Sequence, residues 1–207
     1  MTRALVAGGT GAVGRALLPL LSSSGCEVHA WGRRRTDIAG VNDLVGDLDK
    51  VKLPAADVAF CALGTTRKQA GSEAAFRVID QDLVLAFARA CREAGVETFV
   101  LVSSASANAT SASFYLRVKG EVEREIAGIG FRRVIVVRPS LLLDDRPGRP
   151  AEQVAVNFAR FFAPVLGWLP ARAIEVRTLA RAMIRLAESK EGPALRVVEN
   201  AELHRIG

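Results

Sequence analysis

Short apolar runs alternate with segments of helical periodicity along the whole chain. Three runs are continuously apolar, at Val58–Ala62, Phe99–Val102 and Val134–Val137. Unbroken apolar runs are typical of parallel strands that helices cover on both faces. The alternation therefore predicts an α/β fold, a doubly wound parallel sheet of the Rossmann type.

Each element of this pattern has bounds that the residues indicate. The predicted strands are Arg3–Ala7, Glu27–Gly32, Asp43–Asp47, Val58–Ala62, Thr98–Ser103 and Arg133–Arg138. The predicted helices are Gly11–Ser23, one or two within Ser72–Ala94, and Ser113–Ala127. Glycines at 95 and 128 stop the later helices, as glycine commonly does just past a helix end.

The composition changes at Asp144–Pro150 to charge, glycine and proline, which predicts a loop. The elements expected beyond it are a helix near Ala151–Phe162, a broken segment Pro164–Pro170, a strand near Ala173–Val176, a helix Thr178–Ser189 and a strand Leu195–Val198. This tail is too small for an independent domain. We therefore expect one domain over residues 1–207, with 144–207 as a small C-terminal lid over the carboxyl ends of the strands.

The charge is positive and uneven. The chain carries a net charge of +6, and residues 101–207 hold 16 Lys and Arg against 11 Asp and Glu. These basic residues are spread singly with few aromatics among them, which disfavours a nucleic-acid surface. An anionic cofactor or a small-molecule substrate is the simpler partner for this charge.

The cysteines and histidines indicate the redox compartment and give no sign of a metal site. Cys26, Cys61 and Cys91 are isolated, as expected of thiols in a reducing compartment, and His29 and His204 have no carboxylate cluster beside them. No metal site is therefore expected. No signal-peptide pattern and no sufficiently apolar stretch is present, so we expect a cytoplasmic protein with no membrane partner.

A glycine-rich loop joins the first predicted strand to the first helix. Gly8, Gly11 and Gly14 have the spacing G-x-x-G-x-x-G, and Gly9, Gly11 and Gly14 also match G-x-G-x-x-G. Such glycines allow a tight turn, a close backbone approach to a pyrophosphate, and packing of the helix on the strand. The helix would direct its free N–H groups at the phosphates, so the segment predicts a dinucleotide site.

Arginines follow the second strand, where an NAD-specific site would place an acidic residue on the ribose hydroxyls. Arg33 and Arg34 suit a 2′-phosphate by charge and by bidentate hydrogen bonding. NADP(H) is therefore favoured over NAD(H). A solvated basic turn is the alternative, and Asp37 lies nearby.

Two further strand ends offer cofactor contacts. Asp47 could accept a hydrogen bond from an adenine amino group while Leu48 packs on the ring, although an ordinary turn aspartate fits equally well. The small residues of Cys61–Gly64 would let the backbone approach a ribose.

Tyr115 and Lys119 lie four residues apart on one face of a predicted helix. A lysine ammonium near a phenol lowers the pKa of the phenol, so Tyr115 is the candidate acid/base. A serine at the preceding strand end could hold a substrate carbonyl oxygen. We favour Ser104, with Ser103 and Ser106 as alternatives.

With these residues in this order, the chain resembles the short-chain dehydrogenase/reductase superfamily. It is similar to the small atypical branch, in particular to the Tat-interacting-protein-like oxidoreductases and their bacterial relatives. The stretches that carry the similarity are Leu63–Glu73, Phe114–Glu121, Val137–Leu143 and Ile174–Met183.

The resemblance implies a Rossmann fold that binds NADP(H), with Lys119 on the nicotinamide ribose and Tyr115 as acid/base. The resemblance also places Gly8, Gly11 and Gly14 on the pyrophosphate, Arg33 and Arg34 on the 2′-phosphate, and Pro139, Ser140 and Leu141 at the nicotinamide end. Together with the residues considered above, the expected cofactor contacts are Gly8, Thr10, Gly11, Ala12, Val13, Gly14, Arg33, Arg34, Asp47, Leu48, Cys61, Ala62, Leu63, Gly64, Val102, Lys119, Pro139, Ser140 and Leu141. Many active relatives place an asparagine on the helix after the fourth strand, whereas here Asp80 lies near that point.

The leading hypothesis is an NADP(H)-dependent oxidoreductase that transfers a hydride to or from a small carbonyl or alcohol substrate. A non-catalytic NADP(H)-binding sensor or scaffold is the first alternative, and a nucleotide-sugar epimerase is the second. The sequence names no substrate, and both a monomer and a homodimer fit it.

Overall fold

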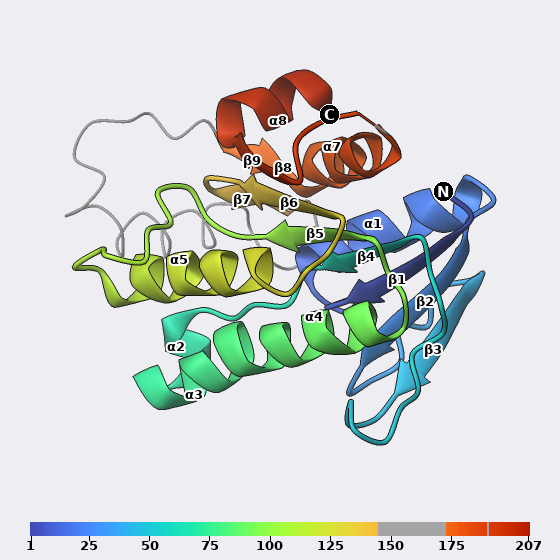
Figure 1. Cartoon of the computed structure of the whole chain (residues 1–207), viewed down its shortest axis with the longest axis horizontal. Coiled ribbons are helices and arrows are strands. Elements are labelled where there is room, and N and C mark those ends of the chain that lie inside the picture. Colours follow the sequence, from blue (N-terminus) through green and yellow to red (C-terminus); the bar gives the residue numbers. More distant parts are fainter. Residues whose placement is uncertain (145–172, 190) are drawn as a thin grey trace.

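The computed structural model describes residues 1–144, 173–189 and 191–207. Its centre is a seven-stranded parallel sheet in the order β3-β2-β1-β4-β5-β6-β9 (Figure 1). The strands are β1 (Arg3–Ala7), β2 (Glu27–Gly32), β3 (Val41–Val45), β4 (Val58–Cys61), β5 (Thr98–Val102), β6 (Arg133–Arg138) and β9 (Leu195–Glu199). The strand order reverses between β1 and β4, which confirms the predicted Rossmann sheet.

Helices cover both faces of this sheet. In Figure 1, α1 and α7 lie on one side, and α4 and α5 lie on the other. The helices are α1 (Ala12–Ser23), α2 (Arg67–Ala70), α3 (Glu73–Arg77), α4 (Leu83–Glu93), α5 (Phe114–Ala127), α7 (Val176–Glu188) and α8 (Asn200–Ile206). One π-helical turn, Val78–Asp82, joins α3 to α4. A second, two-stranded sheet pairs β7 (Leu142–Leu143) with β8 (Ile174–Glu175).

The period of two along the strands divides the core. Phe60 and Val100 pack toward α1 and α7, while their neighbours Ala59 and Phe99 pack toward α4 and α5. All four side chains are fully buried. The continuous apolar runs were therefore correctly interpreted as strands covered on both faces.

The third strand lies two residues earlier than predicted, at Val41–Val45. Gly46 adopts a φ of +138°, outside the range of a regular strand, and its N–H donates to the carbonyl of Gly32. Asp47 therefore belongs to the following turn, where its carbonyl accepts the N–H groups of Lys50 and Val51.

The described part of the C-terminal tail differs from the predicted lid. Residues 195–199 form β9, which adds a strand to the main sheet beside β6, and α7 packs against α1. Leu179, Met183 and Leu203 are fully buried in the same core as α1. Residues 173–189 and 191–207 thus complete the Rossmann core, because their apolar faces cover a sheet face rather than the strand ends. The helix expected near Ala151–Phe162 and the segment Pro164–Pro170 lie outside the described residues.

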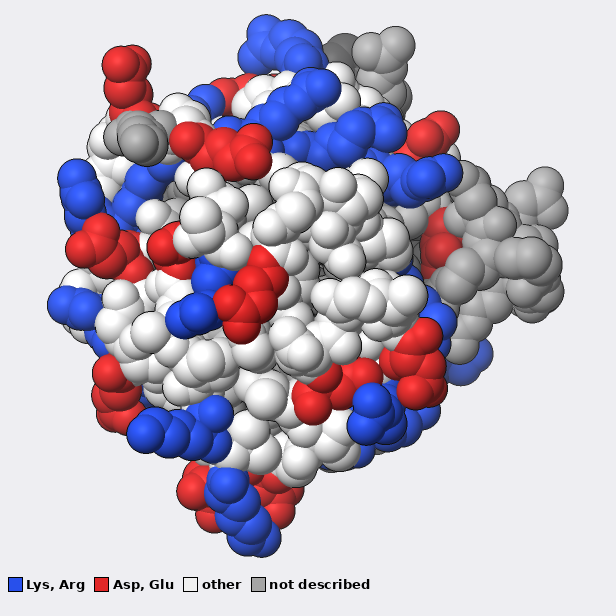
Figure 2. Space-filling view, turned by 90° about the vertical axis from the view of Figure 1, so that its right-hand side faces the viewer, with Lys and Arg blue, Asp and Glu red and all other residues white. Residues whose placement is uncertain are grey.

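Part of the excess positive charge of the C-terminal half is on α7. Its exposed arginines recur every four residues at Arg177, Arg181 and Arg185. Figure 2 shows basic side chains gathered near the top of the face beside β3, with acidic and basic side chains mixed elsewhere. Of the three arginines on α7, Arg181 and Arg185 donate to carbonyl oxygens at the end of α8. Across the described residues, no helix is long and apolar enough to cross a membrane.

Candidate functional site

The glycine loop lies where β1 meets α1, next to the end of β4. Gly8 has a φ of +84°, and a Cβ there would lie 2.4 Å from the carbonyl oxygen of Ala62. A Cβ on Gly14 would lie 2.3 Å from the carbonyl oxygen of Gly8. Neither position has room for a side chain, because strand end and helix approach the loop so closely. The glycine pattern is thus a packing requirement that brings β1, α1 and β4 together.

The N-terminus of α1 leaves its first N–H groups without a side-chain cap, since its N-cap residue is Gly11. Thr10, Ala12 and Val13 flank this N-terminus, and the helix has 12 residues. Arg15 donates from Nε to the carbonyl of Thr10 at 3.2 Å, so a cation also lies against the loop. Free amides and a positive helix end fit a pyrophosphate.

The arginines after β2 differ in their partners. Arg35 lies 3.8 Å from Asp43 and 3.7 Å from Asp37, and Asp43 also accepts the N–H and hydroxyl of Thr36. Arg33 and Arg34 are exposed and have neither a hydrogen bond nor an ion pair within residues 1–144, 173–189 and 191–207. Two guanidinium groups are therefore available to an anion beside the glycine loop.

Thr36 fixes this arginine loop on the glycine loop. A Cβ on Gly9 would lie 2.8 Å from the Thr36 methyl group, so the two loops are in contact. Asp43 was not among the predicted site residues, although its side chain is only 3% exposed and orients Thr36. A buried acid on a weakly patterned strand gives no signal in the sequence.

The predicted adenine contacts lie after β3. The side chain of Asp47 is 68% exposed and pairs with Lys50 at 3.0 Å. Leu48 packs against the core on the α4 side. The exposed carboxylate suits the edge of a site better than its centre.

At the end of β4, a buried ion pair joins Lys119 of α5 to Asp80 of the π-helical turn. Nζ of Lys119 lies 2.8 Å from Oδ1 of Asp80, with side-chain exposures of 8% and 0%. The other oxygen, Oδ2, accepts the backbone N–H of Thr65 at 2.8 Å. Burial alone would lower the pKa of Lys119, but the charge of Asp80, the interaction with Tyr115 and the hydrogen bond to Asp80 together raise it. Lys119 is therefore an ammonium group at neutral pH.

The segment that follows β4 passes next to this ion pair. It consists of Cys61, the last residue of β4, followed by Ala62, Leu63 and Gly64. The Cys61 thiol is fully buried, and desolvation raises its pKa to about 12. A Cβ on Gly64 would lie 3.3 Å from Oδ1 of Asp80 and 3.6 Å from Nζ of Lys119. Because Gly64 has no side chain, the space directly against the ion pair is open. A ribose fits there, whereas a side chain at position 64 would fill this space.

Tyr115 lies in the first turn of α5, one turn before Lys119. Its half-buried ring is 5.6 Å from the ring of Phe76, and Nζ of Lys119 lies 5.9 Å from its centroid. The i, i+4 spacing thus places the phenol and the ammonium on one helix face, as predicted.

The three candidate serines after β5 lie in different surroundings. Ser103 donates its hydroxyl to the carboxylate of Glu123, which makes it part of a buried network. Ser106 is exposed and has a φ of +62°. Ser104 is 3% exposed, and its hydroxyl donates a long hydrogen bond of 3.4 Å to the carbonyl of Ala105.

The loop that carries Ser104 is bound to the start of α5. The N–H of Asn108 donates to the carbonyl of Leu116 at 3.0 Å, and Arg117 donates to the carbonyls of Ser111 and Ala112. These bonds hold the loop that follows Ser104 against the first turns of α5, the helix that carries Tyr115.

The expected nicotinamide contacts lie at the carboxyl ends of β5 and β6. They are Val102, Pro139, Ser140 and Leu141. The carbonyl of Pro139 accepts the N–H of Ala105 at 2.9 Å. The N–H of Ser140 donates to the side chain of Asn200 at 3.0 Å. These residues are thus fixed beside the Ser104 loop from the side of β9.

Sequence reasoning missed the network under this edge. Arg138 of β6 donates to Glu123 and, from Nη1, to Glu199 at 2.9 Å. Lys119 and Glu123 lie four residues apart on α5, but each has a partner from another segment: Asp80 for Lys119 and Arg138 for Glu123. No sequence signal identifies such distant partners.

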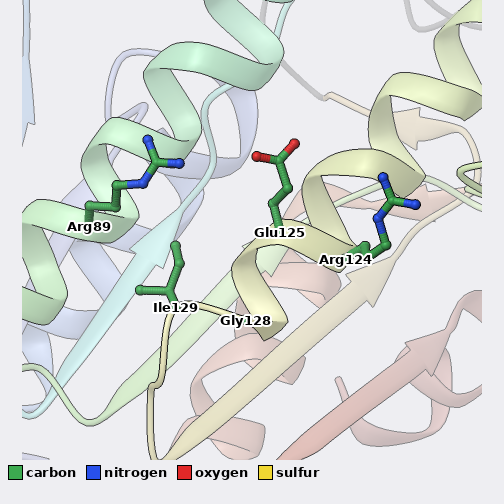
Figure 3. A pocket seen from close by; sticks show the side chains of 5 residues that line it. All are labelled: Arg89, Arg124, Glu125, Gly128 and Ile129. Carbon is green, nitrogen blue, oxygen red and sulfur yellow. The ribbon is translucent and has the colours of Figure 1, made fainter.

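A separate hollow of about 490 Å³ lies between α4 and α5, lined by Arg89, Arg124, Glu125, Gly128 and Ile129. Figure 3 shows the Glu125 side chain between the two arginines. Gly128 caps the C-terminal end of α5, whereas Tyr115 and Lys119 lie in its first two turns. The hollow is therefore at the opposite end of α5 from the candidate site. The described residues also contain no cluster of His, Cys, Asp and Glu that could hold a metal ion.

Comparison with known proteins finds relatives that match nearly the whole chain. The sequence model of a family described as NAD(P)H-binding matches residues 8–160. The rat protein HTATIP2 is 35% identical over 215 residues, which cover 98% of this chain and 88% of the relative. The mitochondrial protein FMP52 of Debaryomyces hansenii is 33% identical over 221 residues, which cover 98% of this chain and 97% of the relative.

Solved structures share the fold at low sequence identity. Human epimerase family protein SDR39U1, solved with NADPH, matches with a TM-score of 0.67 at 21% identity, over 95% of this chain and 74% of that chain. MoeE5, solved with UDP-glucose and NAD, matches with a TM-score of 0.72 at 21% identity, over 95% and 75% of the two chains.

The expected cytoplasmic location is contradicted by these relatives. Several FMP52 proteins that match this chain are named as mitochondrial. The expectation failed because free thiols and the lack of a sufficiently apolar stretch are features that proteins of several compartments share, whereas a cellular address is a signal read by a receptor.

Proposed function

The chain belongs to the NAD(P)H-binding family of atypical short-chain dehydrogenase/reductases, and on that premise we propose that it is an NADP(H)-dependent oxidoreductase acting on a small carbonyl or alcohol. The observation that carries the NADP(H) preference is the pair Arg33 and Arg34, exposed and without partners among the described residues. Their charge and fork geometry match a 2′-phosphate.

The carboxyl edge of the sheet supports an extended dinucleotide. The order β2-β1-β4-β5 sets the arginines at one end, the glycine loop in the middle and the Lys119 corner at the other. In the proposal, the α1 N-terminus binds the pyrophosphate and Lys119 holds the nicotinamide ribose beside Gly64. Asp47 and Leu48 lie at the adenine edge, and Pro139, Ser140 and Leu141 lie at the nicotinamide edge.

Proton transfer in this proposal belongs to Tyr115. When bound, the nicotinamide supplies the hydride for the carbonyl carbon or accepts it from an alcohol. Tyr115 donates its phenolic proton to the carbonyl oxygen as the alcohol forms, and takes it back in the reverse direction. The hydroxyl of Ser104, whose hydrogen bond within the described residues is a long one of 3.4 Å to the carbonyl of Ala105, orients that oxygen.

One observation favours a second function, a non-catalytic NADP(H)-binding sensor. Lys119 is buried and paired with Asp80, which lies near the point where the resemblance implies an uncharged asparagine in many active relatives. An ammonium held by a carboxylate polarises a neighbouring phenol less than an unpaired one does. Cofactor would then bind without turnover.

Equilibrium titration with NADPH and NADH, followed by the fluorescence of the reduced nicotinamide, tests the proposal. We expect NADPH to bind at least about tenfold more tightly, the effect of one or two charge-assisted hydrogen bonds. Equal affinities would remove the roles of Arg33 and Arg34, and binding of neither would overturn the function. A panel of carbonyl substrates then separates the two candidates, because turnover supports the oxidoreductase and tight binding without turnover supports the sensor.

A further inference from the structure

The ion pair of Asp80 and Lys119 places an ammonium and a compensating carboxylate together at the nicotinamide side of the proposed site. Within the described part of the chain, the largest electrostatic effects on Lys119 come from Asp80 of the π-helical turn, Tyr115 of its own helix and Cys61 of β4. The Cys61 thiol is neutral at physiological pH because burial raises its pKa to about 12. Asp80 is thus the anion that compensates the ammonium.

The carboxylate of Asp80 is fixed rather than mobile. It is fully buried, Oδ2 is held by the N–H of Thr65 at 2.8 Å, and Oδ1 lies 2.8 Å from Nζ of Lys119. It belongs to a single π-helical turn, a feature frequent at functional sites because it re-aims side chains. A fixed carboxylate compensates the Lys119 charge in the same way whichever form of a ligand is bound.

Charge is distributed unevenly along the proposed site. Arg33 and Arg34, which have no partner among the described residues, carry positive charge at the proposed adenosine end, where both forms of the cofactor present the same 2′-phosphate. The forms differ at the other end, where the oxidised nicotinamide ring carries a positive charge and the reduced ring is neutral. Only charges near Lys119 can therefore distinguish them strongly, since Coulomb energy falls with distance.

We propose that Asp80 sets the preference of this site between the oxidised and reduced cofactor, by compensating a buried ammonium that would otherwise repel the oxidised nicotinamide ring. The inference rests on the proposed function, because it requires the nicotinamide ribose to lie against Lys119. Asp80 is in this sense a positioning and specificity-determining residue. It acts through Lys119 and beneath Gly64, whose missing side chain leaves the pair open to the ligand.

The decisive quantity is the ratio of the dissociation constants of NADP⁺ and NADPH, measured at low ionic strength and about pH 6.5. Asp80→Asn keeps an oxygen for the Thr65 N–H but removes the charge. Like charges about 10 Å apart in an effective dielectric constant of about 20 repel enough for roughly a tenfold effect, which salt reduces. We expect the ratio to rise about fivefold or more.

Two further variants separate charge from structure. Lys119→Met leaves the Asp80 carboxylate uncompensated, so the ratio is expected to fall by a similar factor even though both affinities weaken. The double variant with Asp80→Asn restores neutrality and is expected to return the ratio to within about twofold of the wild-type value. Asp82→Asn changes an exposed carboxylate in the same helical turn and is the matched control, with no expected change.

The outcomes are distinguishable. If Asp80→Asn weakens both cofactor forms by the same factor, Asp80 is only structural and the inference fails while the proposed function stands. If the wild-type protein binds neither form, the proposed function fails first. If Asp80→Asn does not fold, as judged by circular dichroism, the direction of the Lys119→Met ratio decides: a fall supports the inference and no change overturns it.

Discussion

The guanidinium of Arg138 holds the carboxylate of Glu123 with two hydrogen bonds, 3.0 Å from Nε to Oε1 and 2.6 Å from Nη2 to Oε2. The pair joins β6 to α5, and Glu123 also accepts the hydroxyl of Ser103. Side-chain groups from α5, from β6 and from Ser103, which follows β5, therefore meet in one network next to Ser104. The position of the loop that carries Ser104 thus depends on Arg138 and Glu123, two charged residues that contact no ligand in the proposed function.

Glu123→Gln should destabilise the fold. Both partners are largely buried, with side-chain exposures of 10% and 21%, so the change leaves Arg138 without its bidentate partner. We expect the free energy of unfolding to fall by about 2–4 kcal/mol, measured by urea denaturation. Glu97→Gln is the control, because Glu97 and Arg132 form an exposed pair, and its loss should stay below about 1 kcal/mol. Equal losses in the two variants would contradict the role of the network.

Arg33→Ala should weaken NADPH binding and leave NADH binding unchanged. Loss of a charge-assisted hydrogen bond to the 2′-phosphate predicts about a 10- to 100-fold rise in the NADPH dissociation constant. Arg35→Ala is the matched control, since Arg35 is already paired with Asp43 and Asp37, and its effect should be smaller. A comparable loss of NADH affinity in Arg33→Ala would mean that the arginine shapes the loop instead of binding the phosphate.

Tyr115→Phe should abolish most turnover of any carbonyl substrate that the wild-type protein reduces, while NADPH affinity stays within about twofold. The phenyl ring keeps its packing against Phe76, so stability should change by less than about 1 kcal/mol. Turnover is followed by NADPH absorbance and affinity by its fluorescence. Loss of cofactor binding, or retained turnover, would refute the acid/base role of Tyr115.

The three thiols should be unreactive in the folded protein. Cys26, Cys61 and Cys91 are buried, and burial raises the pKa of each thiol, to about 12 for Cys61. We expect no alkylation by iodoacetamide at about pH 8 in buffer, and modification of all three cysteines in urea, measured by mass spectrometry. Rapid modification of one thiol in the native protein would show that its strand opens locally.

The same thiols give stability a pH dependence. The unfolded thiol ionises above its ordinary pKa of about 9, whereas Cys61 in the folded protein stays protonated up to about pH 12. Above pH 9 the unfolded state therefore binds fewer protons, so the free energy of unfolding falls as pH rises, by up to about 1.4 kcal/mol per pH unit for each such thiol. Cys61→Ala should flatten this alkaline slope, although it also lowers stability throughout by leaving a cavity.

The predicted fold was correct where one sequence pattern determines one element. Continuous apolar runs identified β4, β5 and β6, and the glycine loop identified the β1–α1 junction, because burial on two faces and backbone crowding each demand a particular residue type. The third strand was misplaced because Val41–Val45 is half-exposed and carries a weak pattern. The described part of the predicted lid is a strand, β9, and two helices of the core, since an apolar helix face does not say which surface it covers.

The candidate site was only partly visible in the sequence. Tyr115 and Lys119 share a helix face, so their spacing alone brings them together. Asp80 as the partner of Lys119, Asp43 as the anchor of Thr36, and Arg138 as the partner of Glu123 all depend on contacts between distant segments. No local periodicity encodes such contacts.

The π-helical turn Val78–Asp82 has a consequence for how this chain could change during evolution. Such a turn accommodates one residue more than a regular helix, and the surplus shifts the register of everything that follows by about 100°. Deleting a single residue there would fuse α3 and α4 into one uninterrupted helix and turn Asp80 away from Lys119. A chain that lost this extra residue would have a more regular helix at this point. It would then need an acidic residue from another segment to neutralise the lysine.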